Sequence, residues 1–394
     1  MPETVPQQRS GAVLVAFITG QIGMHSAMAG LRMTAPLQAL HEGFSAWTVG
    51  LLLALFAVAP VLSALYAGRL ADRHGYHRPV ALAAALTIGG GVLAILSSLL
   101  GGVLHVALMC LAAMAMGAGS NIGMLTIQRT AGLAARDSTE RVRIFSWLGV
   151  APSFSNVLGP VAAGFVIDGL GFTAAYVMLT LLPLATLVTA RQVPRLPPPV
   201  VEHVADRTAW DLLAVPGFSR LLAVNWLLSM CWDVHIFAVP VLGHERGFNA
   251  STIGVILGTF TLTVTLVRLV IPWMAHRLSE LTVLRTAMVG TGVIFALYPL
   301  APNALLMGVC AALLGLTLGS VQPMVMSMLH HITPDHRHGE ALALRSMAMN
   351  TSSTLMPLLF GATGALVGAS LLFWVVGGAV AAGSWTARRL RTGP

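Results

Sequence analysis

The sequence contains no lysine, although 22 of its 394 residues are arginine. A P-loop ATPase needs a lysine beside the nucleotide phosphates, and a Schiff base with retinal or pyridoxal phosphate also requires one. Protein kinases depend on a lysine as well. The missing lysine therefore excludes these classes, and we expect a protein without P-loop ATP hydrolysis and without a cofactor.

Charged residues of any kind are scarce, at 9% of the chain against 56% hydrophobic residues. Soluble globular domains contain about 25% charged residues, so most of this chain must face lipid or other helices within lipid. Cysteine is scarce too. Cys110, Cys231 and Cys310 lie in apolar stretches without a CxxC pair, which is typical of small buried side chains rather than of a disulfide framework.

Apolar windows long enough to cross a bilayer predict an all-α membrane protein with twelve transmembrane helices. The predicted spans are 12–38, 46–68, 79–100, 103–130, 141–167, 172–190, 218–242, 251–275, 282–300, 303–329, 340–364 and 368–387. A polar, proline-rich stretch at 191–217 is typical of a linker. We therefore predict a six-helix bundle at 1–190, the linker at 191–217, and a second six-helix bundle at 218–394.

Arginine lies mostly on one side of this predicted topology. Seventeen arginines occur in or beside the N-terminus, the C-terminus, the linker and the loops that follow the second, fourth, eighth and tenth spans. Arg246 alone lies in a loop on the opposite side. Because cytoplasmic loops are enriched in basic residues, we expect a multi-pass inner-membrane protein with both termini in the cytoplasm. The net charge of +8 then reflects topology and lipid contact, not nucleic-acid binding.

The two predicted bundles are related by sequence. Residues 43–56 and 247–260 share identities at one constant offset, namely Gly43, Phe44, Ala46, Thr48, Gly50, Leu53 and Phe56 in the first copy. Later in each half, Pro160 and Gly164 correspond to Pro357 and Gly361. A duplication of six spans is typical of transporters in which two pseudo-symmetric bundles rock about a site at their interface.

The loop between the second and third spans carries a recognisable motif, GRLADRHGYHR at 68–78. It resembles the G-x-x-x-D-R-x-G-x-x-R signature of the major facilitator superfamily (MFS), and the length, spans and repeat are similar to that family. The resemblance implies the MFS fold and a secondary transporter, not an enzyme, whose loop acid and arginine latch the bundles on the cytoplasmic side. The gating residues that it implies are Gly68, Asp72, Arg73, Gly75, Arg78, Arg268 and Arg277.

The fifth span resembles the antiporter motif of drug exporters in this superfamily. The matching residues are Gly149, Pro152, Gly159, Pro160 and Gly164. Close helix packing accounts for the same pattern, and we assign packing to Gly149, Gly159, Pro160, Gly164, Pro357 and Gly361. Such exporters usually carry an arginine in the fourth span at the position of Ala113. A proton-driven multidrug efflux antiporter is therefore the alternative to a metabolite carrier.

Polar residues within spans are energetically costly and commonly face a cavity or a partner. Gln21, His25 and Arg32 follow one face of the first span, and Asp233 lies in the seventh. In the resembled family, the first, fourth, seventh and tenth spans line the cavity. The candidate substrate-binding residues are Gln21, His25, Arg32, Asn121, Gln128, Arg129, Trp226, Asp233, His235, Gln322 and Arg345. Arg32 and Asp233 could instead pair with each other across the bundle interface.

An excess of arginine over acid within the spans favours an anionic group on the substrate, because a guanidinium fork matches carboxylate or phosphate. Asp233, His25 and His235 are the candidate proton carriers. We expect a monomeric secondary active transporter that moves a small organic anion or zwitterion with proton coupling. The sequence lacks the HExxH and GxSxG motifs of a membrane enzyme. The histidines at 330–338 match no closed zinc site, so we expect no metal.

Overall fold

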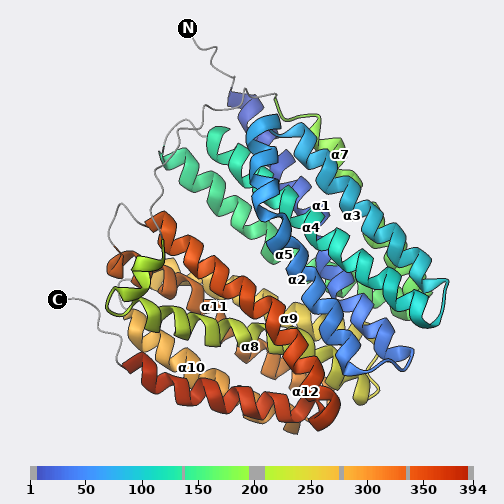
Figure 1. Cartoon of the computed structure of the whole chain (residues 1–394), viewed down its shortest axis with the longest axis vertical. Helices are drawn as coiled ribbons and strands as arrows, with labels where there is room; N and C mark the ends of the chain where they lie inside the picture. Colours follow the sequence, from blue (N-terminus) through green and yellow to red (C-terminus); the bar gives the residue numbers. More distant parts are fainter. Residues whose placement is uncertain (1–6, 135–137, 195–208, 275–278, 334–337, 389–394) are drawn as a thin grey trace. The chain divides into compact units, whose positions relative to one another are not determined.

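The structure, a computed structural model, describes residues 7–134, 138–194, 209–274, 279–333 and 338–388. All regular secondary structure in these ranges is helical (Figure 1), which confirms the predicted all-α fold. The α-helices are α1 (Gln7–His41), α2 (Ala46–His74), α3 (His77–Ser98), α4 (Gly102–Ala134), α5 (Ser138–Leu170), α6 (Phe172–Leu181), α7 (Leu184–Ala190), α8 (Phe218–Glu245), α9 (Ala250–Met274), α10 (Glu280–Leu297), α11 (Ala304–Ile332) and α12 (His338–Arg388). Two short 3-10 helices are η1 (Ala209–Ala214) and η3 (Tyr298–Leu300).

Eleven helical stretches in the described residues are long and apolar enough to cross a membrane. The helices α6 and α7, on either side of Pro183, together form one of them, Phe172–Ala190. The helix α12 breaks at Gly368, whose φ of 79° lies in the left-handed region that favours glycine. The part of α12 after the break, Gly368–Trp385, is one of the eleven candidate membrane spans. The predicted span 340–364 is helical, but it is not one of the eleven. The break lies where the sequence predicts the junction of the last two spans.

The chain forms two compact units. The first contains residues 1–38 and 55–203, and the second contains residues 39–54 and 204–394. The boundary after His203 lies inside the stretch that the sequence predicts as a linker. The sequence-based division differs from these units in one segment, 39–54, which it assigns to the first bundle.

Close backbone contact explains why residues 39–54 belong to the second unit. A Cβ at Gly50 of α2 would lie 2.2 Å from the carbonyl oxygen of Pro357 in α12. A Cβ at Gly361 would lie 3.0 Å from the carbonyl oxygen of Ala46. Small residues permit such an approach of two helices in a membrane. The first turns of α2 therefore pack on α12, and Gly50 and Gly361 leave the space for that contact.

In the first unit, α3 packs against α4 and α6 (Figure 1), and α1 is held by glycine contacts and buried hydrogen bonds. A Cβ at Gly159 of α5 would lie 2.5 Å from the carbonyl oxygen of Ser26 in α1. Thr186 Oγ1 donates to the carbonyl oxygen of Gly20 at 2.8 Å. Packing and interhelical hydrogen bonds drive helix association in lipid, where burial from water is absent. These contacts therefore fix the position of α1, which carries three candidate site residues.

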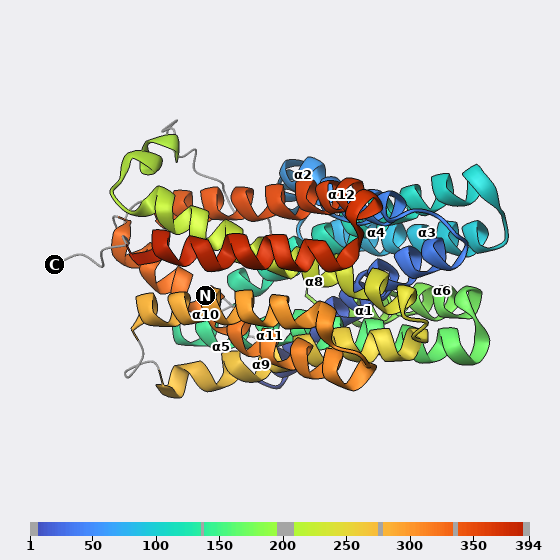
Figure 2. The ribbon, with the colours of Figure 1, turned by 90° about the horizontal axis from the view of Figure 1, so that it is seen from below.

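In the second unit, α12 packs against α8 and α10, and α9 packs against α11 (Figure 2). Two glycines of α11 permit the contact with α9. A Cβ at Gly315 would lie 2.5 Å from the carbonyl oxygen of Phe260, and a Cβ at Gly319 would lie 3.0 Å from Cα of Val264. The close approach sets the register of the two helices, so that polar residues one turn further along them come into contact.

Arg246, the lone arginine of an opposite-side loop, has a structural role in the second unit. Its Nη1 donates to the carbonyl oxygen of Ala301, and its Nη2 donates to the carbonyl oxygen of Pro299 at 2.6 Å. Carbonyl groups at the C-terminal end of a helical segment carry partial negative charge and lack intrahelical partners. The guanidinium therefore joins the end of α8 to the chain that follows α10.

We predict that Gly159→Ala lowers the free energy of unfolding by about 1–3 kcal/mol, because the added Cβ overlaps backbone atoms of α1 that no rotamer change can move. Gly149→Ala is the matched control on α5, since its Cβ would meet no atom of the described residues within 4 Å. Unfolding in mixed detergent micelles measures both variants. Equal stability of the two would contradict the close packing of α1 on α5.

Candidate functional site

In the first unit, the candidate residues of α1 lie close to α4. Ser120 Oγ lies 3.4 Å from Nδ1 of the half-buried His25. The positive charge of Arg32, two turns along α1, acts on His25. Gln21 is buried, and neither polar atom of its side chain has a hydrogen-bond partner among the described residues. The helix α1 thus presents a cation, a histidine and an unsatisfied amide in one row.

Three further candidates lie on α4, and all three are half-buried: Asn121, Gln128 and Arg129. Asn121 Nδ2 donates to the carbonyl oxygen of Pro60 in α2 at 3.4 Å. Gln128 and Arg129 lie about 10 Å further along the axis of α4. Ser120 therefore contacts His25 of α1 while the neighbouring Asn121 contacts α2, and Gln128 and Arg129 lie apart from both.

The predicted gating loop is only partly described. Gly75 has a φ of 66°, in the left-handed region that favours glycine, and it turns the chain from α2 into α3. Arg78 is exposed at the start of α3. Gly68, Asp72 and Arg73 fall in the last turns of α2, where side chains lie outside the described part, and all of Arg277 lies outside it. Their gating role stays a prediction.

In the second unit, Asp233 of α8 is 3% exposed and accepts hydrogen bonds from two serines of α12. Ser352 Oγ donates to Oδ2 at 2.9 Å, and Ser353 Oγ donates to Oδ1 at 3.2 Å. An ionised carboxylate only accepts hydrogen bonds, and a hydroxyl can turn to accept when the carboxyl is protonated. The pair of serines can therefore serve either protonation state. Neither serine is among the residues predicted from the sequence, although both lie in the polar run NTSST at 350–354.

His235, also on α8, is completely buried. Its Nε2 lies 3.2 Å from the hydroxyl of Tyr298, and its ring lies 4.3 Å from the ring of Phe260, centroid to centroid. Trp232 also packs on Phe260, with the two ring centroids 4.6 Å apart. The contacts place His235 inside aromatic packing. Trp226 lies on the same helix, half-buried.

Three predicted residues meet on α9, α11 and α12, and we call them the arginine cluster: Arg268, Gln322 and Arg345. Arg268 Nη2 donates to Gln322 Oε1 at 2.9 Å. Arg345 lies near enough for its charge to act on Arg268. Arg268 was predicted as a gating residue and the other two as substrate-binding residues, so the hydrogen bond between Arg268 and Gln322 joins the two predicted groups.

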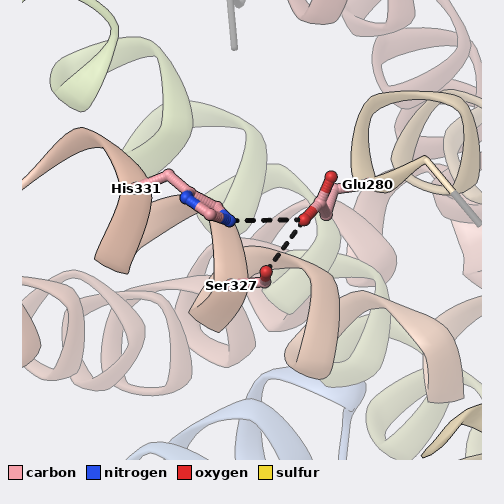
Figure 3. Close-up of polar contacts among 3 residues, drawn as sticks. All are labelled: Glu280, Ser327 and His331. Carbon is pink, nitrogen blue, oxygen red and sulfur yellow. Dashed lines mark hydrogen bonds and ion pairs between the residues drawn. The ribbon is translucent and has the colours of Figure 1, made fainter. Parts of the chain in front are cut away.

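A second polar group, whose contacts were not predicted from the sequence, joins α10 to α11 (Figure 3). Ser327 Oγ donates to Oε1 of Glu280 at 2.9 Å, and Nε2 of His331 lies 3.8 Å from the same oxygen. His331 belongs to the histidine-rich stretch. No group of three metal-ligating side chains occurs among the described residues, and 334–337 lie outside them. The contacts give this stretch a helix-joining role at His331.

The family follows from comparison with known proteins. The sequence profile of the Major Facilitator Superfamily matches residues 13–231 and 221–394. The chain belongs to the major facilitator superfamily. This MFS protein is therefore a multi-pass secondary transporter of a small molecule, as the motif at 68–78 predicted, and not an enzyme.

Relatives in sequence include exporters. The enterobactin exporter EntS of Shigella flexneri is 26% identical over 349 residues, which cover 86% of this chain and 81% of EntS. The enterobactin exporter EntS of Salmonella typhimurium is 25% identical over 347 residues, which cover 86% of this chain and 82% of EntS. The similarity extends over most of both chains.

Solved structures support the MFS fold. A POT family transporter in complex with a thioalcohol conjugated peptide aligns with a TM-score of 0.75 at 12% identity, over 94% of each chain. A bacterial homologue of the iron transporter ferroportin gives a TM-score of 0.74 at 15% identity, over 96% of this chain and 98% of its own. The nucleoside transporter NupG gives 0.72 at 14% identity, over 96% and 99%. At these identities the likeness concerns the fold alone.

We predict that Tyr298→Phe lowers the free energy of unfolding by about 1–3 kcal/mol, because the buried Nε2 of His235 loses its partner. The ring itself stays stacked on Phe373, at a centroid distance of 4.7 Å, so the variant removes only the hydroxyl. Unfolding in mixed detergent micelles measures the loss. An unchanged unfolding curve would show that the contact between His235 and Tyr298 adds nothing to stability.

Proposed function

We propose that this MFS transporter exports a small organic anion or zwitterionic metabolite by alternating access, driven by protons. The EntS relatives, both named as exporters, support the direction. They also support a place in the bacterial inner membrane, where the arginine-rich loops favour cytoplasmic termini. We propose that the monomer is the working unit, since each chain carries two bundles of the transporter fold.

The balance of charge within the helices carries the proposal of an anionic substrate. Away from the helix ends, Asp233 is the one carboxylate in the described spans, whereas Arg32, Arg268 and Arg345 all lie within helices. Charged side chains are costly in a membrane and commonly mark substrate or ion pathways. A guanidinium presents a fork of donors that matches carboxylate or phosphate oxygens. An anion bound to such a guanidinium would lower the cost of keeping that charge within a helix.

Asp233 is the residue that we assign to proton transfer. Its two serine partners can donate to the ionised carboxylate and turn to accept from the protonated one, so both states are satisfied in place. His235 is sealed among aromatic rings, and we assign it a packing role. His25 is half-buried beside Ser120 and stays the second candidate for a proton carrier.

A proton-driven multidrug antiporter is the second candidate function. The close approach of α5 to α1 at Gly159 agrees with an antiporter motif in α5. A buried alanine, Ala113, stands where drug exporters usually have an arginine in the fourth span. Proteoliposomes separate the two functions, because an anion carrier transports carboxylates or phosphates and a drug antiporter transports cationic dyes.

We predict that Arg32→Gln lowers the rate of organic-anion flux into inside-out proteoliposomes at least about tenfold, because the substrate loses a charge-assisted hydrogen bond. Arg191→Gln, at an exposed arginine after α7, is the control and should transport at the wild-type rate. The experiment measures uptake of radiolabelled anions with an imposed proton gradient. Unchanged flux in Arg32→Gln would remove Arg32 from the substrate site.

We predict that Asp233→Asn removes the dependence of anion flux on the proton gradient, while exchange of anion for anion continues. An asparagine keeps the size of the side chain but cannot gain or lose the proton. His235→Asn should keep the dependence, since we assign His235 to packing. Flux at several imposed gradients measures both variants. Gradient-dependent flux in Asp233→Asn would transfer the proton role to His25 or another group.

A further inference from the structure

The arginine cluster presents hydrogen-bond donors from three helices of one unit. Arg268 uses the side-chain oxygen of Gln322 as an acceptor, which leaves the amide nitrogen of Gln322 as a further donor. The positive charge of Arg345 acts on the guanidinium of Arg268. A ligand that enters this cluster therefore meets two guanidinium groups and one amide, all of which donate.

Arg345 is the member that most needs a partner. Its side chain is 7% exposed, and its Nε is buried without a hydrogen-bond acceptor among the described residues, as is Nε of Arg268. No carboxylate in the described part of the chain forms an ion pair with either guanidinium. A buried charge is costly unless it is paired and hydrogen-bonded. The buried Arg345 and the half-buried Arg268, whose charges act on each other, indicate a ligand that supplies acceptors and negative charge.

We propose that the arginine cluster binds a dianionic group, such as a phosphate monoester, a phosphonate or two adjacent carboxylates. Two guanidinium groups repel each other in a low dielectric, and a single negative charge compensates only one of them. A dianion compensates both, and its oxygens accept from both forks and from the Gln322 amide. The proposal rests on the proposed function in that the dianionic group is taken to be part of the transported solute.

The position of the cluster suits the loading of an exporter. Arg268 lies within two turns of the end of α9 at Met274, and Arg345 lies two turns after the start of α12 at His338. Both of these helix ends adjoin loops on the arginine-rich side of the predicted topology, which corresponds to the cytoplasm. A solute that enters from the cytoplasm meets the cluster early in its passage.

The test compares ligand binding by the full chain and by single variants in nanodiscs of phosphatidylcholine. The probes are methylphosphonate and succinate as dianions, with acetate as the monoanion. We expect dianions to bind at least about tenfold more tightly than acetate, and Arg345→Gln or Arg268→Gln to weaken dianion binding at least about tenfold. Arg285→Gln, at another arginine of this unit, is the matched control and should bind as the wild type does.

Thermal unfolding gives a second readout that does not depend on a measured affinity. Without ligand, Arg345→Gln should unfold at a higher temperature than the wild type, because it removes a buried charge that lacks a partner. With methylphosphonate, the wild type and Arg285→Gln should be stabilised and Arg345→Gln should not. Equal binding of acetate and dianions, or full dianion binding by Arg345→Gln, would overturn the proposal.

The same chemistry could come from a lipid head group, so a second set of nanodiscs contains cardiolipin. If cardiolipin raises the unfolding temperature of the wild type but not of Arg345→Gln, and the soluble dianions have no effect, the ligand is not the transported solute. If dianions bind through Arg345 but are not transported, the site stands and the proposed function fails. If anion flux is normal in both arginine variants, the proposed function stands and the site fails.

Discussion

The low dielectric of the membrane interior is the constraint on which the rest of this structure depends. A polar group that leaves water needs a partner inside the protein, since lipid offers none. Asp233 has two serine hydroxyls, and Arg246 has two backbone carbonyls. Arg345 differs from these two because its Nε lacks an acceptor in the described part of the chain, as do Nε of Arg268 and Nε of Arg285. The satisfied groups stabilise the fold, and the buried charge of Arg345 is the group on which the proposed anion site depends.

Much of the fold could be predicted from the sequence, because length and apolarity suffice to define a membrane helix. Apolar windows gave the helices, and the motif at 68–78 indicated the family. The unit to which segment 39–54 belongs was harder to predict, because it depends on how closely Gly50 and Gly361 allow the backbones of α2 and α12 to approach. Such a contact joins residues far apart in the chain, and no local pattern encodes it.

In the candidate site, too, some residues could be predicted from the sequence and others could not. Residue type and position predicted Arg32, Asp233 and Gln322, because a polar side chain is conspicuous in an apolar run. Their partners were not predictable. Serine and threonine satisfy themselves on the backbone of their own helix in many places, as Thr126 does with Ile122 at 2.8 Å. Only the packing of α8 on α12 distinguishes the serines that bind Asp233 from those that do not.

The contact of Arg246 with the carbonyl oxygens after α10 bears on how the solute would be released in the proposed export. For an exporter of anions, the side of release should hold the solute weakly, so that it leaves and does not return. The guanidinium on that side donates one hydrogen bond from Nη1 and one from Nη2 to backbone oxygens, which holds the charge against the chain after α10. In the export that we propose, a departing anion would therefore meet a positive charge held in place by the backbone, not one on a mobile side chain that could follow the solute.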